Sequence, residues 1–139
     1  MNTKEYNRKF LDDHEHLSAL GVQIANQKEG TATLSLPFSD SICNPDSGVI
    51  HGGVIATLID HAGGVAIRTT LENPGDVPHA TTDLNVTYVR PGTGDLRADA
   101  TVVRAGRTMG VVSIEVSEPS AGKENIVAVG RASIHLTRD

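Results

Sequence analysis

The residues best suited to chemistry lie in "GVIHGGVIATLIDHAGG", residues 48–64. A histidine, His51, precedes a pair of glycines, and a single acid, Asp60, follows nine positions after the histidine. Glycines in the first turn of a helix leave backbone N–H groups uncovered, and a helix N-terminus carries ~0.5 of a positive charge. The stretch therefore suits a site that binds a carbonyl or carboxylate oxygen, with Asp60 as a base or nucleophile.

Each of these residues also has a structural interpretation. Gly52 and Gly53 could simply allow a tight turn into a helix, and His51 could cap that helix instead of acting as a base or orienting a ligand. Asp60 could face the surface, or it could be satisfied by backbone donors. A carboxylate in the middle of a buried helix is costly unless it is paired or has a task, so a functional role is favoured. His61 is interpreted as an ordinary packed histidine.

Composition and charge exclude several classes of partner. The chain has 139 residues and a formal net charge of −5 without a basic patch, which argues against nucleic acids and anionic membranes. No apolar run approaches the ~18 residues of a membrane span, and the polar N-terminus is unlike a signal peptide. A single cysteine excludes an internal disulfide and fits the cytoplasm that we expect. The histidines and acids lack metal-ligand spacing, so we expect no metal.

Hydrophobic periodicity predicts two helices around this stretch. Apolar residues at helical spacing indicate an amphipathic N-terminal helix over residues 1–20, ended by Gly21. From 51 to 71 the residues are apolar or small on nearly every side, which is typical of a buried central helix. Its opposite face is expected to carry Asp60 among small residues and Ile67. Its broad apolar face is expected to hold Val54, Ile55, Leu58, Ile59, Ala62, Val65 and Ala66.

Alternating Val, Ile and Thr predict the strands that wrap this helix. Residues 21–38 indicate a hairpin or one bent strand. Four further strands over 79–90, 95–105, 108–118 and 125–138 are joined by "PGTG", "GR" and "PSAGKE", short enough for a four-strand meander of hairpins. The sequence therefore predicts an α+β fold in one domain over 1–139. In it, a curved antiparallel sheet of five to six strands wraps the central helix.

The segment "NPDSGVIHGGVIATLIDHAGG" resembles the signature of the PaaI-type (phenylacetate-degradation-like) hotdog-fold acyl-CoA thioesterases, in which an acid follows H-G-G nine residues after the histidine. The resemblance extends through "TTDLNVTYVRP" and "VVRAGRTMGVVSIEV", over roughly residues 20–137. It implies the hotdog fold and hydrolysis of an aryl- or medium-chain acyl-CoA to the free acid and CoA. The acyl-CoA is then the substrate, and no cofactor is expected. The shared sites of the family imply a homodimer or a dimer of dimers (homotetramer).

The resemblance also implies roles for individual residues. Asp60 falls on the catalytic acid of the family, and His51 and Gly53 fall on its thioester-carbonyl site. Asn44 falls near a loop asparagine, although the loop between Asn44 and His51 is one residue longer than the commonest version. Thr81 falls where relatives carry a Ser or Thr that positions water. Substrate contacts are expected from Gly52, Val54, Gly63, Gly64, Thr82, Arg90, Arg104 and Arg107.

Some of these assignments have alternatives. Thr82 could replace Thr81, although strand alternation places only one of the two on the side that faces the helix. Arg90, Arg104 and Arg107 are candidates for binding the CoA phosphates, but each could instead be a solvated residue at a strand end. Two other functions also compete with hydrolysis. One is a hotdog-fold acyl-thioester hydratase or dehydratase, whose usual motifs are absent here, and the other is a non-catalytic acyl-CoA-binding protein.

The spacing within the central helix has a consequence for assembly. Gly53 and Asp60 are seven residues apart, so they are separated by ~10 Å along the helix axis at ~1.5 Å per residue. One thioester carbonyl must lie ~3 Å from its donor and close to the base. The sequence therefore predicts a homodimer in which donor and acid come from two copies of the helix.

Overall fold

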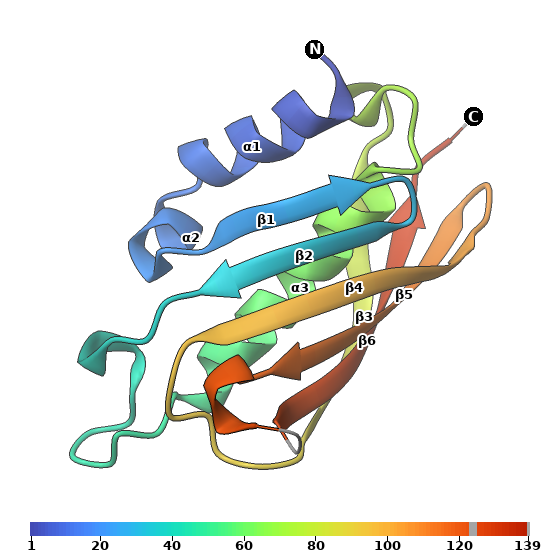
Figure 1. Cartoon of the computed structure of the whole chain (residues 1–139). Helices are drawn as coiled ribbons and strands as arrows, with labels where there is room; N and C mark the ends of the chain where they lie inside the picture. Colours follow the sequence, from blue (N-terminus) through green and yellow to red (C-terminus); the bar gives the residue numbers. More distant parts are fainter. Residues whose placement is uncertain (123–124, 139) are drawn as a thin grey trace.

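A single antiparallel sheet curves around one long helix in the computed structural model, which describes residues 1–122 and 125–138 (Figure 1). The helices are α1 (Thr3–Asp13), α2 (Glu15–Leu20) and α3 (Gly52–Arg68), with short 3-10 turns at Asp40–Ile42, Pro74–Asp76 and Pro119–Ala121. The strands are β1 (Gln23–Lys28), β2 (Thr31–Leu36), β3 (His79–Tyr88), β4 (Leu96–Ala105), β5 (Met109–Ser117) and β6 (Ile126–Leu136). The predicted α+β class is confirmed, and residues 21–38 form the hairpin β1–β2.

The order of the strands, β1-β2-β4-β5-β6-β3, shows that the predicted four-strand meander is wrong. Only β4, β5 and β6 follow one another as hairpins, and the "PGTG" segment belongs to a crossover between the outer strand β3 and β4. The reason is that β4 continues the apolar face of the first hairpin. Buried residues of β2 pair with buried residues of β4: Ala32 with Ala100, Leu34 with Ala98, and Leu36 with Leu96. The turn predicted over 119–124 lies partly outside the described residues.

Helix α3 lies against the inner face of the sheet and is the centre of the core (Figure 1). It ends at Arg68, before the predicted Leu71. The predicted apolar face is buried except for Val54, which is half-buried. Ile67, predicted on the small face, is also fully buried. It can reach the sheet because β5 carries a glycine there: a methyl group at Gly110 would lie 2.4 Å from Cδ1 of Ile67.

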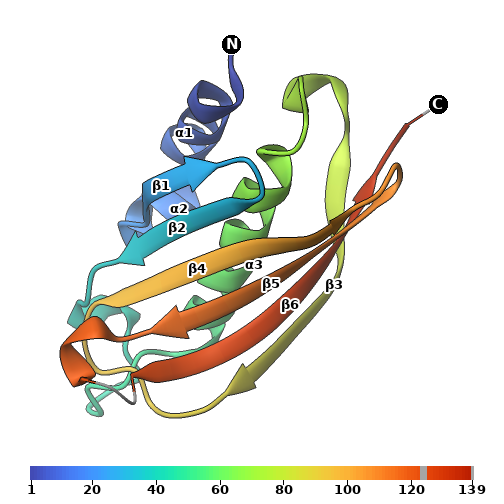
Figure 2. The same ribbon diagram turned by 45° about the vertical axis from the view of Figure 1, so that its right-hand side comes forward.

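The N-terminal segment forms two helices rather than the single one predicted over 1–20. His14 ends α1 and begins α2, and its Nδ1 accepts a hydrogen bond from the Leu17 N–H at 3.3 Å, which satisfies a donor at the new helix start. The predicted stop at Gly21 is confirmed, since this residue has the left-handed φ of 79° of a C-cap. Helix α1 contacts α3 and β1 beside the edge of the sheet, so the chain start covers part of α3 (Figure 2).

The close packing of β6 against its neighbours predicts that Gly130 cannot be replaced by a larger residue without loss of stability. A methyl group there would lie 2.8 Å from Cγ2 of Ile59 and 2.9 Å from the backbone oxygen of Asn85, which cannot rotate away. We expect Gly130→Ala to lower the free energy of unfolding by ~1–3 kcal/mol, measured by urea denaturation. The control is Gly75→Ala, whose new methyl would meet its nearest neighbour at 3.6 Å and should change stability by less than ~0.5 kcal/mol. Equal effects of the two substitutions would contradict this prediction.

Candidate active site

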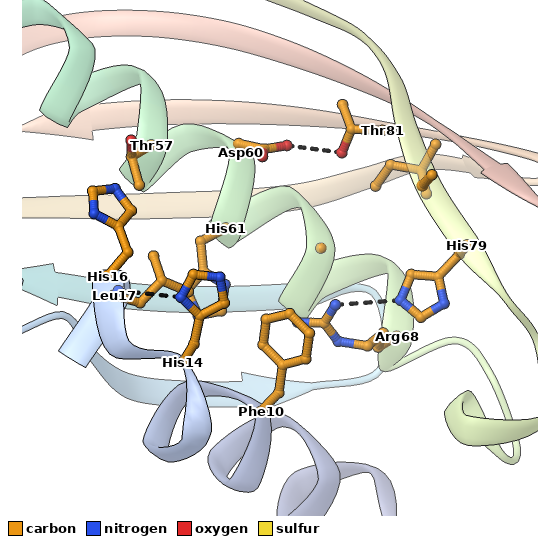
Figure 3. Close-up of a pocket in the computed structure, with 13 residues that line it drawn as sticks. Phe10, His14, His16, Leu17, Thr57, Asp60, His61, Arg68, His79 and Thr81 are labelled. Atoms are coloured by element: carbon orange, nitrogen blue, oxygen red, sulfur yellow. Dashed lines mark hydrogen bonds between the residues drawn. The ribbon is translucent and has the colours of Figure 1, made fainter.

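Asp60 projects from the middle of α3 toward β3, where Thr81 meets it (Figure 3). The Thr81 hydroxyl donates a hydrogen bond to Asp60 Oδ1 at 2.8 Å. Thr82 sits at an irregularity in the pairing of β3 with β6, and its hydroxyl donates to the Ser133 carbonyl at 3.2 Å. Of the two threonines considered from the sequence, Thr81 is therefore the one beside Asp60.

Asp60 and Thr81 line a pocket of about 360 Å³ between the N-terminal helices, α3 and β3 (Figure 3). Gly64, a predicted contact residue, lines the same pocket. Most of the other walls were not predicted and include Phe10, His14, His16, His61, Arg68 and His79. Arg68 did carry a sequence signal, because Asp60, Gly64 and Arg68 follow one another at four-residue spacing and share a helix face. No local pattern indicates where Phe10 and His14 dock.

His51 caps the start of α3, as the structural interpretation of this residue proposed. Its Nδ1 accepts a hydrogen bond from the Gly53 N–H at 2.8 Å. A neutral imidazole that accepts at Nδ1 carries its proton on Nε2, which makes Nε2–H a donor. The Gly53 N–H thus has a partner within the chain, and neither His51 nor Gly53 lines the pocket of Asp60.

The remaining predicted residues are spread over the molecule. Asn44 is exposed in the loop before α3, where its N–H donates to the Val49 carbonyl at 2.8 Å, and it does not line the pocket of Asp60. The Gly52 carbonyl accepts a hydrogen bond from the Tyr88 hydroxyl at 2.6 Å. Gly63 faces the sheet, where a methyl group would lie 3.1 Å from Cβ of Ala132. The structure therefore does not place Gly63 at the pocket. The lack of a side chain at this position instead allows the helix to pack closely on the sheet.

The three arginines predicted for phosphate binding do not form one cluster. Arg90 lies before β4, and its Nη2 is 3.8 Å from a carboxylate oxygen of Glu118. Arg104 is near the other end of β4, and Arg107 is in the turn that follows. A single phosphate site built from all three within one chain is therefore excluded by their positions.

Arg68 is the most deeply buried cation at the pocket, with 4% of its surface exposed. Its Nε donates to Oδ1 of the buried Asn7, and its Nη1 lies 3.3 Å from Nε2 of His79. His79 Nδ1 donates to the Val77 carbonyl at 2.8 Å, so His79 Nε2 is the acceptor for Arg68. Desolvation lowers the pKa of Arg68 to about 10, a value at which the guanidinium is still charged at pH 7.

His61 is buried beside this cation, and the prediction of a packed histidine is confirmed. Desolvation, followed by the charges of Arg68 and His14, lowers the pKa of His61 to about 3. The imidazole is therefore neutral at pH 7. The Phe10 ring stacks on it with centroids 5.9 Å apart.

The low pKa of His61 predicts a pH dependence of stability. Between about pH 6.5 and pH 3 the unfolded chain binds a proton at His61 that the folded chain does not, so the free energy of unfolding falls as the pH falls. We expect His61→Leu to reduce this loss by up to ~1.4 kcal/mol per pH unit, measured by chemical denaturation at pH 7 and pH 4.5. The control is His16→Leu, which removes an exposed imidazole and gives the slope with which that of His61→Leu is compared. An unaltered slope in His61→Leu would refute the neutral assignment.

The described residues offer neither a metal site nor a membrane-spanning helix. In residues 1–122 and 125–138, no three His, Cys, Asp or Glu side chains are grouped so that they could hold a metal ion. The helices in that part of the chain are all too short or too polar to cross a membrane. The expectation that no cofactor is needed stays a prediction.

Comparison with known proteins places this geometry in a family. The model of the thioesterase superfamily matches residues 47–123, which contain His51, Asp60 and Thr81. A Halobacterium salinarum protein, named provisionally as an esterase, is 45% identical over 137 residues, covering 95% of this chain and 91% of that protein. The medium/long-chain acyl-CoA thioesterase YigI of Salmonella typhimurium is 30% identical over 111 residues, covering 70% of this chain and 72% of that protein.

A solved structure shows the same fold. The PaaI protein of E. coli, from the phenylacetic acid degradation operon, superimposes with a TM-score of 0.85 at 22% identity and covers 98% of this chain and 94% of its own. The matched family, the curated relatives and the architecture agree. The chain belongs to the thioesterase superfamily and has the hotdog fold.

Proposed function

We propose that this protein is an acyl-CoA thioesterase of the PaaI type, which hydrolyses an aryl- or medium-chain acyl-CoA to the free acid and CoA. The observation that carries the proposal is the carboxylate of Asp60, held by the Thr81 hydroxyl at a pocket large enough for an acyl group. A relative named as a medium/long-chain acyl-CoA thioesterase supports the substrate class. The single cysteine supports a cytoplasmic location as part of the same proposal.

In this mechanism Asp60 activates water. The Thr81 hydroxyl occupies Oδ1, which leaves Oδ2 to take a proton from a water molecule. The hydroxide formed attacks the thioester carbonyl carbon, the C–S bond breaks, and the thiolate of CoA takes up the proton that Asp60 had accepted. The alternative is direct attack by Asp60, which forms an acyl-enzyme anhydride that water then cleaves. Both routes consume one water and release one acid and one thiol.

The thioester carbonyl needs a donor, and the start of α3 offers two. His51 carries a proton on Nε2, and the Gly53 N–H becomes available when the His51 ring turns away from it. Both lie at the positive end of the helix dipole, which stabilises the charge that develops on the carbonyl oxygen. Either donor would polarise the carbonyl without placing another charge in the site.

The site is proposed to be completed by a second copy of the chain. His51 and Gly53 do not line the pocket of Asp60, so one chain does not bring donor and acid together. Strand β3 is an outer strand of the sheet with exposed Leu84 and Tyr88, and an open strand edge is a template for pairing with another chain. We infer that β3 pairs with β3 of its partner across a two-fold axis, as a homodimer or within a dimer of dimers.

The role of Asp60 is tested by Asp60→Asn, which keeps the shape but removes the base. We expect hydrolysis to fall by ~10²–10⁴-fold with little change in folding or in binding of the thioester. The measurement is release of free thiol from a panel of acyl-CoA esters, which also separates hydrolysis from hydration and from simple binding. Asp12→Asn is the matched control, since this exposed acid lies outside the pocket. A variant that kept half of the wild-type turnover would show that Asp60 is structural.

The shared site is tested by mixing two inactive variants, Asp60→Asn and Gly53→Val. A side chain at Gly53 would collide with the His51 ring, because a methyl group there lies 2.9 Å from Nδ1. After co-refolding in equal amounts, about half of the dimers are mixed and each holds one intact site, so activity should recover to roughly a quarter of wild type. Differently tagged copies would confirm that mixed dimers form. Their presence without recovered activity would rule out the shared site.

A further inference from the structure

The buried guanidinium of Arg68 has no carboxylate at ion-pair distance in the part of the chain that the structure describes. Buried charges are normally paired, because removing an unpaired ion from water is costly. Among the described residues no carboxylate lies within ion-pair distance of Arg68, although 96% of its surface is covered and it remains charged at pH 7. Its direct partners, Asn7 and His79, are both neutral acceptors. Asp60 of the same pocket interacts with this charge without forming an ion pair, so none of the hydrogen-bonded partners of the guanidinium compensates its charge.

Arg68 also has hydrogen-bonding capacity left over. Its Nη2, which carries two N–H groups, is buried and has no acceptor in the described part of the chain. Nε2 of His61 is also buried there without a hydrogen-bond partner. Both residues line the pocket of Asp60 (Figure 3). An unsatisfied buried donor costs free energy, so Nη2 of Arg68 at this pocket points to an acceptor supplied by a ligand.

The position of the guanidinium limits the size of that ligand. Arg68 folds back along α3, so that its Nη1 would lie 3.1 Å from a methyl group at Gly64. Gly64 is four residues beyond Asp60, so the guanidinium and the reacting carbonyl are separated by ~6 Å along the helix. An extended chain covers ~3.5 Å in three bonds. An acyl group that spans this ~6 Å therefore has roughly five bonds between its thioester carbonyl and its far end.

We propose that Arg68 forms an anion-binding subsite at the acyl end of the pocket, so that the preferred substrates are short thioesters whose acyl group ends in a carboxylate. A carboxylate there would pair with the guanidinium, accept from Nη2 and face the neutral His61. The inference rests on the proposed thioester hydrolysis, to which it adds a substrate class. Arg68 is in this role a specificity-determining residue, and Asp60 remains the reacting group.

Phe10 packs on the residues of this subsite. Its ring covers one face of the guanidinium, with 4.6 Å from Cζ to the ring centroid, and it also stacks on His61. The N–H groups of a guanidinium point outward in its own plane, so a ring on the face does not use them. Phe10 is 38% exposed and belongs to the N-terminal helix α1. The ring therefore leaves the in-plane N–H groups of Arg68 available to a ligand.

The test compares two five-carbon thioesters that differ only at the far end, glutaryl-CoA and pentanoyl-CoA. Wild-type protein should show at least a tenfold higher kcat/KM for glutaryl-CoA, after subtraction of spontaneous thiol release. Arg68→Met should lose this preference through its effect on glutaryl-CoA alone. Two results would overturn the proposal and leave Arg68 a structural residue. One is a wild-type protein without the preference, and the other is an Arg68→Met variant in which kcat/KM falls equally for both substrates.

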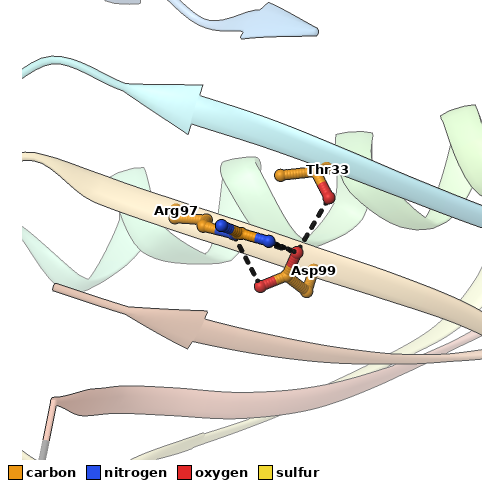
Figure 4. A network of polar contacts seen from close by, with 3 residues as sticks. All are labelled: Thr33, Arg97 and Asp99. Atoms are coloured by element: carbon orange, nitrogen blue, oxygen red, sulfur yellow. Dashed lines mark hydrogen bonds and ion pairs between the residues drawn. The ribbon is translucent and has the colours of Figure 1, made fainter. Parts of the chain in front are cut away.

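Matched variants separate the role of Arg68 from a general effect of removing an arginine and from misfolding. Arg97→Met is the control, because Arg97 is exposed on the outer face of β4, where it pairs with Asp99 (Figure 4). It should retain the wild-type preference. If Arg68→Met does not fold, Arg68→Lys takes its place, since an ammonium keeps the charge but loses the planar fork. We expect Arg68→Lys to reduce the preference at least threefold, and an unchanged preference would contradict the subsite.

Binding of unreactive analogues separates this inference from the proposed function. The thioethers S-(4-carboxybutyl)-CoA and S-pentyl-CoA cannot be hydrolysed, and calorimetry gives their dissociation constants. At least tenfold tighter binding of the carboxylated analogue, lost in Arg68→Met, would support the subsite even if no thioester were cleaved. Hydrolysis of pentanoyl-CoA together with equal binding of both thioethers would instead uphold the thioesterase and reject the anion subsite.

Discussion

A helix can approach a sheet as closely as α3 approaches β5 and β6 only where one of the two surfaces lacks side chains. This constraint is met by glycines on both sides: Gly63 on the helix, and Gly110 and Gly130 on the strands. The contact buries one flank of α3 completely, and the curvature of the sheet covers most of the rest. The orientation of the helix is then fixed, and with it the direction in which Asp60 points.

The face of α3 that the sheet does not cover carries the chemistry. Asp60, Gly64 and Arg68 follow one another along it, so an acid and a cation lie at the two ends of a short surface with a glycine between them. Asp60 is held by the neutral Thr81 hydroxyl, which leaves a carboxylate oxygen free to take a proton. The absence of a side chain at Gly64 leaves room for the guanidinium of Arg68 to fold over the helix.

The same constraint explains why one chain is not expected to complete a site. A helix that is held straight against a sheet separates its N-terminal donors from an acid in its middle by a fixed rise per residue. His51 and Asp60 therefore belong to different regions of the surface. Strand β3 contributes Thr81 to the pocket and also forms an open edge, so pairing through this edge would bring a second helix close to the first site.

Local patterns in the sequence determined the elements and part of the site. The period of the apolar residues gave the long helix and the extents of the strands, and the lone acid among small residues gave Asp60, because both depend on residues a few positions apart. The pairing of β2 with β4 and the outer position of β3 depend on which apolar faces pack together although they are far apart in the sequence. The short "PGTG" segment does not indicate this pairing. The break at His14 likewise depends on how α1 docks on α3. Arg68 lies on the face of Asp60 by its spacing, but its burial among Asn7, His79 and Phe10 comes from three distant segments. Only the tertiary structure brings these together, because their contacts result from packing of the N-terminal helices and β3 against α3.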